Sequence, residues 1–259
     1  MGYRLSACLD LLFTENRPDI GDRVRAAADA GLDAVEIWGL QDKNIDSLKS
    51  GLTDTGVELL SLVVEPRTQF MLDPRHEPFY EGLQSAADAA EDLGCPYLVV
   101  TSGIGNPGVR RAQQLDQLVE VFAHAADLLH KREVTLLLEN VNTRVDHPGS
   151  LLDRTSECAD VVRRVASPRF RLLYDLYHSV SMAEDVSAEL DAASGLVAHI
   201  QIADTPDRTE PGSGTQDWPL RLRQVRATGY DGVIGLEYRP TSDTVRSLDY
   251  IREVASTSW

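Results

Sequence analysis

Four polar residues in the second half of the chain each stand at the end of a short, mostly apolar run. They are Glu139, Asp175, Gln201 and Glu237. Each run has the length of a buried strand. Successive positions are 36, 26 and 36 residues apart, and each interval suits one strand–helix unit. Parallel neighbouring strands would point all four side chains into one opening, where three carboxylates repel each other unless a cation joins them.

The chemistry of these side chains indicates which cation that would be. All four offer oxygen and none is a cysteine, which favours Mg, Mn or Co, with Zn possible. The expected cofactor is therefore one divalent metal ion, which would polarise a carbonyl group and stabilise an enediolate. Glu139 and Glu237 are predicted to be the acid and base that move a proton between neighbouring carbons of a small hydroxycarbonyl or sugar substrate.

Four further residues are predicted to contact the substrate, namely His178, Arg208, Glu210 and Glu65. A single carboxylate at a strand end is a helix cap or a member of a surface ion pair as often as it is a functional residue. The prediction therefore depends on the recurrence of such residues over successive strands. By contrast, His199 is expected to be structural, since it lies within an apolar strand.

Apolar runs bounded by turn residues predict eight strands, and amphipathic stretches between them predict eight helices. The expected strands cover residues 4–9, 34–38, 57–64, 97–100, 134–138, 170–174, 196–202 and 233–236. The expected helices cover residues 17–30, 42–55, 79–93, 110–131, 153–165, 183–193, 219–228 and 244–255. Strict alternation implies parallel strands that are joined by crossover helices.

The expected fold is a TIM barrel, with residues 1–259 forming a single domain. Eight strand–helix units in 259 residues match that architecture. A doubly wound sheet is the rival fold, but it normally carries a glycine-rich turn after its first strand, and residues 10–14 read Asp-Leu-Leu-Phe-Thr. In a TIM barrel the active site forms at the C-terminal ends of the strands, where the four polar residues lie.

The composition excludes several classes of function. A formal net charge of −16 opposes binding to nucleic acid or to an anionic membrane surface. No apolar run is long enough for a membrane span, and the N-terminus does not resemble a secretory signal. Three widely spaced cysteines are expected to be reduced thiols. We therefore expect a cytoplasmic enzyme that acts on a small-molecule substrate. Its only other expected partners are further copies of the same chain in a homo-oligomer.

Several motifs in the chain resemble those of the hydroxypyruvate isomerase group within the xylose isomerase-like TIM barrels. The resemblance covers nearly the whole chain. It is carried by residues 13–15, 138–149, 172–178, 199–203, 208–214 and 229–240.

The resemblance implies that the four strand-end residues bind one divalent metal. It further implies that Glu139 and Glu237 are the acid/base pair and that His178 and Arg208 contact the substrate. Position 201 is a glutamine, as in the pattern of the hydroxypyruvate isomerase group, whereas the related ketose epimerases usually have histidine there. Two positions of the loop after this strand depart from the group's pattern, since Thr209 replaces a histidine and Thr215 replaces a glutamate.

Other activities are compatible with the same residues. A metal-dependent dehydratase or other lyase, or an epimerase, would use the same metal and carboxylates on a keto-sugar or keto-cyclitol. An abasic-site endonuclease would need several histidine ligands and a basic surface, which the charge of −16 does not suit. A sugar-binding barrel without catalytic activity would not need both Glu139 and Glu237.

Overall fold

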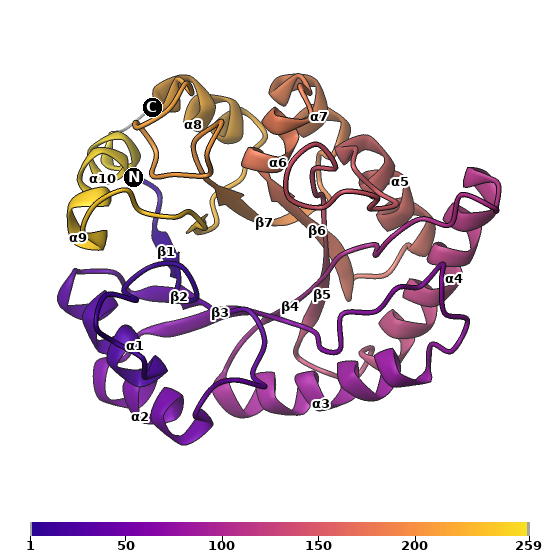
Figure 1. The fold of residues 1–259 in the computed structure, drawn as a ribbon, viewed down its shortest axis with the longest axis horizontal. Coiled ribbons are helices and arrows are strands. Elements are labelled where there is room, and N and C mark those ends of the chain that lie inside the picture. Colours follow the sequence, from indigo (N-terminus) through magenta and orange to yellow (C-terminus); the bar gives the residue numbers. More distant parts are fainter. Residues whose placement is uncertain (1, 258–259) are drawn as a thin grey trace. The chain divides into compact units, whose positions relative to one another are not determined.

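The computed structural model describes residues 2–257 and contains eight parallel strands in a closed order, β1 to β8. This confirms the predicted TIM barrel (Figure 1). The strands are β1 (Leu5–Cys8), β2 (Ala34–Glu36), β3 (Glu58–Val63), β4 (Tyr97–Val100), β5 (Thr135–Glu139), β6 (Phe170–Asp175), β7 (Val197–Ile202) and β8 (Ile234–Leu236). Each overlaps one of the eight strands expected from the sequence.

The described residues form ten helices, two more than predicted. They are α1 (Ile20–Asp29), α2 (Ile45–Thr55), α3 (Glu77–Leu93), α4 (Arg111–Leu128), α5 (Thr155–Val165), α6 (Leu176–Ser181), α7 (Val186–Ala192), α8 (Trp218–Ala227), α9 (Thr244–Ser247) and α10 (Asp249–Ser256). The first addition, α6, begins directly where β6 ends. The second arises because the expected last helix is divided into α9 and α10 at Leu248.

Helix boundaries follow the local capping residues. The side chain of Asn44 accepts a hydrogen bond from the backbone N–H of Ser47 at the start of α2. That helix ends at Gly56, whose φ of 71° lies in the left-handed region that glycine adopts without strain. The side chain of Asp185 caps α7 in the same way as Asn44 caps α2. Capping chemistry of this kind is why the predicted boundaries lie close to the observed ones.

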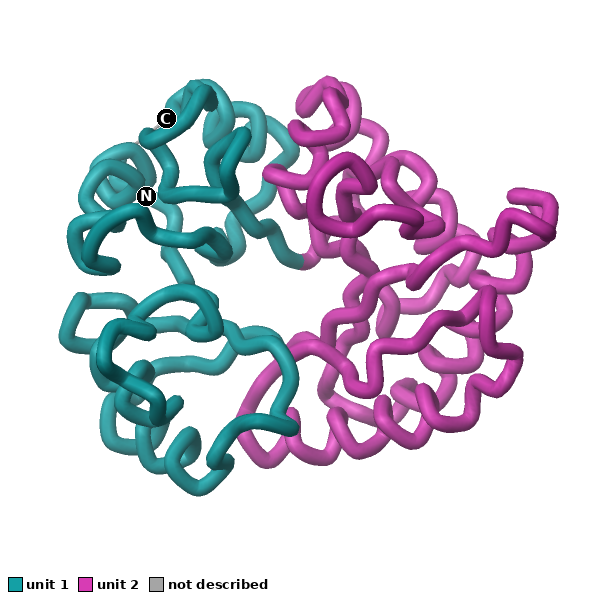
Figure 2. Tube along the Cα trace, in the orientation of Figure 1, with its two compact units in different colours: residues 1–61, 199–259 teal, residues 62–198 magenta. Residues whose placement is uncertain are grey.

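The chain divides into two compact units (Figure 2). Unit 1 comprises residues 1–61 and 199–259, and unit 2 comprises residues 62–198. The assignment of all 259 residues to one domain stays a prediction.

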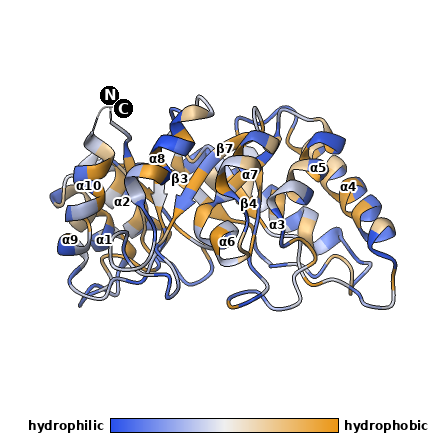
Figure 3. Cartoon of the chain, turned by 90° about the horizontal axis from the view of Figure 1, so that it is seen from above, coloured by the Kyte–Doolittle hydropathy of each residue, from blue (hydrophilic) through white to orange (hydrophobic). Residues whose placement is uncertain are grey.

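The core of unit 2 shows why its strands are nearly continuous apolar runs. Val99, Leu137 and Leu173 come from β4, β5 and β6 and pack together as one buried cluster. On the helix side of the strands, the rings of Phe122 and Phe170 stack with centroids 4.9 Å apart. Burial on both faces therefore selects apolar side chains at successive positions. Figure 3 shows orange, hydrophobic stretches along the strands, while the helices carry both orange and blue stretches.

The three cysteines, Cys8, Cys95 and Cys158, are buried free thiols. Among residues 2–257, no helix combines the length and the apolar character that crossing a membrane requires.

Candidate functional site

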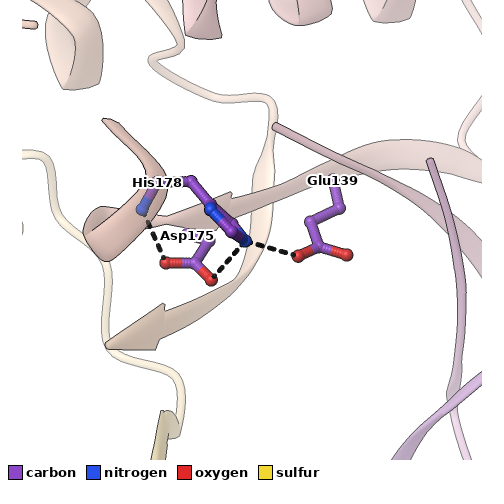
Figure 4. Close-up of side chains that lie close together, drawn as sticks. All are labelled: Glu139, Asp175 and His178. Atoms are coloured by element: carbon purple, nitrogen blue, oxygen red, sulfur yellow. Dashed lines mark hydrogen bonds and ion pairs between the residues drawn. The ribbon is translucent and has the colours of Figure 1, made fainter. Parts of the chain in front are cut away.

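Unit 2 brings together Glu139, Asp175 and His178 (Figure 4). Glu139 is the last residue of β5, Asp175 is the last residue of β6, and His178 lies in the first turn of α6. The Nε2 atom of His178 lies 3.6 Å from Oε1 of Glu139 and 3.5 Å from Oδ2 of Asp175. One ligand atom from each residue lies within 4.8 Å of the other two, which is close enough for a shared cation. The two carboxylates of this group therefore fit a divalent metal.

The ends of β5 and β6 are joined by Asn140, which directly follows Glu139. The Oδ1 atom of Asn140 accepts the backbone N–H of Asp175 at 2.8 Å, and its Nδ2 atom donates to the Asp175 carbonyl at 3.1 Å. The Oδ1 atom of Asp175 caps α6 by accepting the backbone N–H of His178 at 3.2 Å. The orientation of the Asp175 carboxylate is thus set by the helix that follows it, and its Oδ2 atom faces His178.

The loop after β5 contacts the same histidine. The Nδ2 atom of Asn142 lies 2.7 Å from Nδ1 of His178 and also donates to Oδ2 of Asp146 at 2.7 Å. The hydroxyl of Tyr177 donates to the same Asp146 oxygen at 2.8 Å. The ring of His147 meets the His178 ring edge to face, with centroids 5.2 Å apart. His178 is therefore held from two sides by buried and half-buried polar groups.

Unit 1 holds Glu237, which directly follows β8, between two N–H donors. The indole Nε1 of Trp38 donates to Oε1 of Glu237 at 2.6 Å, and the guanidinium of Arg208 donates to Oε2 at 2.6 Å. Both Glu237 and Arg208 are buried. The thiol of Cys8 lies 4.0 Å from Oε1 of Glu237. Burial, and then the nearby Glu237 carboxylate, raises the pKa of Cys8 well above its usual range, so Cys8 is no candidate nucleophile.

A second buried carboxylate of unit 1, Glu36 in β2, orients Gln201. The Nε2 atom of Gln201 donates to Oε2 of Glu36 at 2.8 Å. An amide that donates through its nitrogen turns its oxygen away from that carboxylate, so the Gln201 oxygen is the atom left to serve as a metal ligand. The imidazole Nε2 of His199 lies 3.0 Å from Oε1 of Glu36, consistent with the structural role expected for this histidine.

Burial opposes the charged form of Glu36, but the interaction with His199 and the hydrogen bonds outweigh it. The interactions with His199, together with hydrogen bonds from Ser6 and Gln201, lower the pKa of Glu36 to about 2. The hydroxyl of Ser61 also donates to Oε2 at 3.1 Å. Glu36 is therefore an anion at neutral pH, and its buried charge is stabilised by the surrounding protein groups.

Gly235 in β8 provides the space for this arrangement. A Cβ atom at this position would lie 2.3 Å from Oε1 of Glu36, 2.9 Å from Cγ of Gln201 and 3.0 Å from Nε2 of His199. We expect Gly235→Ala to lower the free energy of unfolding by about 1–3 kcal/mol, measured by urea unfolding, because the surrounding side chains must move. Gly105→Ala is the control, since its nearest neighbour would be an ordinary 3.4 Å away. Equal stabilities of the two variants would contradict this account of Gly235.

The loop of residues 203–217 is ordered around Asp204, which is fully buried. Its carboxylate accepts N–H groups from Thr205, Gly212, Thr215, Gln216 and the Trp218 indole at 2.8–3.1 Å. Such a carboxylate fixes the path of the loop that carries Arg208.

The remaining two residues of the predicted site, Glu210 and Glu65, contact other parts of their own units. Glu210 directs its carboxylate to Thr241, accepting the backbone N–H at 2.9 Å and the hydroxyl at 2.5 Å. Glu65 lies between β3 and α3, where Gly82 packs against its carbonyl. Contact of Glu65 and Glu210 with a substrate stays a prediction, as does the convergence of Glu139, Asp175, Gln201 and Glu237 on one ion.

The residues predicted from the sequence did not include Glu36, Trp38 or Asn142. A charged residue inside a buried strand was the available signal for Glu36. For Asn142 the signal was its place two residues after Asn140 in the loop that follows β5. Trp38 follows β2 by two residues, but nothing in the sequence connects its indole N–H to Glu237.

Comparison with known proteins shows which family the chain resembles. The xylose isomerase-like TIM barrel family model matches residues 24–254. A Mus musculus protein named "Putative hydroxypyruvate isomerase" is 32% identical, over 96% of this chain and 94% of its own length. The 2-oxo-tetronate isomerase of Cupriavidus necator is 29% identical, over 96% of this chain and 97% of its own length.

A solved structure is similar over a comparable length. The Brucella melitensis protein named AP endonuclease, family 2, has a TM-score of 0.88 and 29% sequence identity, and the match covers 97% of this chain and 98% of that one. The strand order, the residues at the strand ends and the matched length therefore lead to one conclusion. The chain belongs to the xylose isomerase-like TIM barrel family.

Proposed function

We propose that this protein is a divalent-metal-dependent isomerase that moves a carbonyl group between neighbouring carbons of a small hydroxycarbonyl compound. The observation that carries the proposal is the grouping of Glu139, Asp175 and His178 at the ends of two neighbouring strands. Relatives named as isomerases of hydroxypyruvate and 2-oxo-tetronate support this reaction and a substrate that bears a carboxylate. The reaction class would be an intramolecular oxidoreduction of the aldose–ketose type.

The residues proposed to hold the metal are Glu139, Asp175, Gln201 and Glu237. Glu139 and Asp175 end β5 and β6, Gln201 is the last residue but one of β7, and Glu237 directly follows β8. The carboxyl ends of parallel barrel strands share one end of a barrel. When bound, a divalent ion would polarise the carbonyl oxygen of the substrate. The hydrogen bond from Gln201 to Glu36 supports this set because it leaves the amide oxygen as the ligand atom.

Glu139 and Glu237 are proposed to transfer the proton. One carboxylate would remove a proton from the hydroxyl-bearing carbon, and the other would deliver a proton to the neighbouring carbon. The proton of the hydroxyl group would pass to the former carbonyl oxygen, which completes the isomerisation. The donors Trp38 and Arg208 hold the Glu237 carboxylate in a fixed orientation, which suits a group that must meet one carbon atom. Arg208 is also the proposed partner of the substrate's own carboxylate, because a guanidinium binds carboxylates in a planar, two-point geometry.

The substrate itself is proposed by class. Thr209 and Thr215 lie in the loop that carries Arg208, and both depart from the pattern of the hydroxypyruvate isomerase group. The loop path is fixed by Asp204, so a changed side chain there would alter the pocket rather than the position of the loop. A hydroxycarbonyl acid that differs in size from hydroxypyruvate, such as 2-oxo-tetronate, therefore belongs in the first test.

The test starts with protein dialysed against a chelator and reloaded with Mg²⁺, Mn²⁺, Co²⁺ or Zn²⁺ singly. Each form is offered hydroxypyruvate and 2-oxo-tetronate, and the products are analysed by mass spectrometry and chromatography. The proposal predicts a product of unchanged mass that forms only with metal present. A product that has lost water would show a lyase instead, and an unchanged rate in chelator would contradict the proposed metal dependence.

A further inference from the structure

The side chain of Asn142 is buried, and its two ends are chemically distinct. Its Oδ1 atom accepts the backbone N–H groups of Val145 at 2.9 Å and Asp146 at 3.0 Å. Its Nδ2 atom donates to the carboxylate Oδ2 of Asp146 at 2.7 Å. A backbone N–H can only donate and a carboxylate oxygen accepts. These three bonds therefore fix the amide with its nitrogen toward His178.

That nitrogen lies 2.7 Å from Nδ1 of His178. An amide NH₂ group donates and does not accept, so Nδ1 must present a lone pair and carry no hydrogen. In a neutral imidazole the hydrogen is then on Nε2. We infer that Asn142 fixes His178 as the Nε2–H tautomer, which makes Nε2 a hydrogen-bond donor and not a metal ligand.

The three side chains drawn in Figure 4 therefore do not all serve as metal ligands. The three side chains of that group come close enough to share a cation, with Nε2 of His178 nearest to Glu139 and Asp175. A ligating histidine needs a lone pair on Nε2, and its other nitrogen normally donates to an acceptor. Here Nδ1 instead meets an amide donor. Unit 2 therefore supplies two carboxylate ligands and one N–H donor.

The donor has a specific use under the proposed function, on which this step rests. An N–H group beside two metal-binding carboxylates can hydrogen-bond to the substrate oxygen on which negative charge develops. Asn142 would then be a positioning residue, because it acts on the substrate only through His178. The tautomer itself follows from the hydrogen bonds alone and does not depend on the reaction.

A charge-neutral exchange reverses the tautomer. In the double variant Asn142→Asp with Asp146→Asn, position 142 keeps an oxygen for the backbone N–H groups of residues 145 and 146. The second oxygen introduced at position 142 accepts a hydrogen bond from the amide introduced at position 146. Because a carboxylate oxygen can only accept, its contact with His178 also requires a hydrogen on Nδ1. The single variant Asn142→Asp does the same but adds a second carboxylate beside Asp146, so it is the less stable form.

The tautomer is measured on ¹⁵N-histidine-labelled protein without metal or substrate, by two-bond ¹H–¹⁵N correlation spectra. The His178 signals are identified by their absence in His178→Gln. The inference predicts a protonated Nε2 and an unprotonated Nδ1 in the wild type, and the reverse in the double variant. A wild-type ring that carries its hydrogen on Nδ1, or on both nitrogens, would overturn it. This readout stands even if no substrate is turned over.

A second readout separates a donor from a ligand. We expect His178→Gln to change the Kd for Mn²⁺, measured by electron paramagnetic resonance, by less than about threefold, because no metal bond is lost. We expect kcat of the double variant to fall about 10²-fold with little change in KM, since the donor on Nε2 is lost. Loss of Mn²⁺ affinity by more than tenfold in His178→Gln would make His178 a ligand and contradict the inference. Failure of the wild type to bind Mn²⁺ would instead contradict the proposed function.

Discussion

Replacing Glu237 with glutamine is expected to lower kcat by about 10³-fold while KM changes by less than about threefold. Glutamine keeps the length of the side chain, but it cannot accept or deliver the substrate proton, and acid–base groups typically contribute 10² to 10⁴-fold to the rate. The equivalent change Glu139→Gln is expected to have an effect of the same size, because each carboxylate is proposed to serve one of the two carbons. The measurement is steady-state kinetics on metal-loaded protein.

The surface variant Glu58→Gln is the matched control. Glu58 begins β3, at the opposite end of the strand from the proposed site, and its carboxylate forms an exposed ion pair with Arg4. Its loss is expected to leave kcat and KM unchanged, since exposed pairs contribute little. If Glu237→Gln and Glu139→Gln retained wild-type kcat, the protein would not use these carboxylates for proton transfer. Intact ligand binding with no turnover in the wild type would indicate a binding protein.

The second large effect is expected at Glu36. In metal-stripped protein, Glu36→Gln should lower the free energy of unfolding at pH 7 by about 3 kcal/mol, because the variant lacks a buried anion with a pKa of about 2 that His199, Ser6 and Gln201 stabilise. A carboxylate whose pKa is lowered on folding stabilises the protein above its unfolded pKa. That contribution is lost as the pH falls from about 4.5 to about 2. Urea unfolding of both proteins over this range measures the difference.

The pH dependence separates this account from a simple loss of packing. The difference in stability between wild type and Glu36→Gln should shrink as the pH is lowered, because Glu36 becomes protonated in the wild type. Ser61→Ala is the control, since it removes one neutral donor to the same carboxylate and should cost about 1 kcal/mol. A stability difference for Glu36→Gln that stays constant from pH 7 to pH 2 would mean that the charge of Glu36 does not stabilise the fold.

The barrel could be predicted from the sequence because its signals are local. Each strand is a short apolar run, and each helix has its own period and capping residues, such as Asn44 and Gly56 at the ends of α2. The short helix α6 was missed since it follows β6 without an intervening turn and has only six residues, too few for a helical period to show. A helix expected to begin at residue 183 begins instead at Val186, after its cap Asp185.

The details of the site could not be predicted in the same way, since its partners are distant in sequence. Glu36 accepts from Ser6 and Gln201, which are 30 and 165 residues away. Asn142 meets His178 across 36 residues. A single sequence shows that Glu139 and Asp175 end strands, but only the fold shows which amide holds which ring. Residue type and strand position therefore predicted which residues to consider, while their hydrogen-bond partners required the structure.

The central claim, proton transfer between two carboxylates with a bound metal, is tested most directly by isotope incorporation. Metal-loaded protein in deuterated water is mixed with hydroxypyruvate and with 2-oxo-tetronate, and the products are followed by proton NMR. The proton delivered by one carboxylate is not the proton removed by the other, so solvent deuterium must enter the product. We expect deuterium on the carbon next to the new carbonyl, in metal-loaded protein only. An isomer that forms at full rate without deuterium at that carbon would indicate hydride transfer and contradict the account.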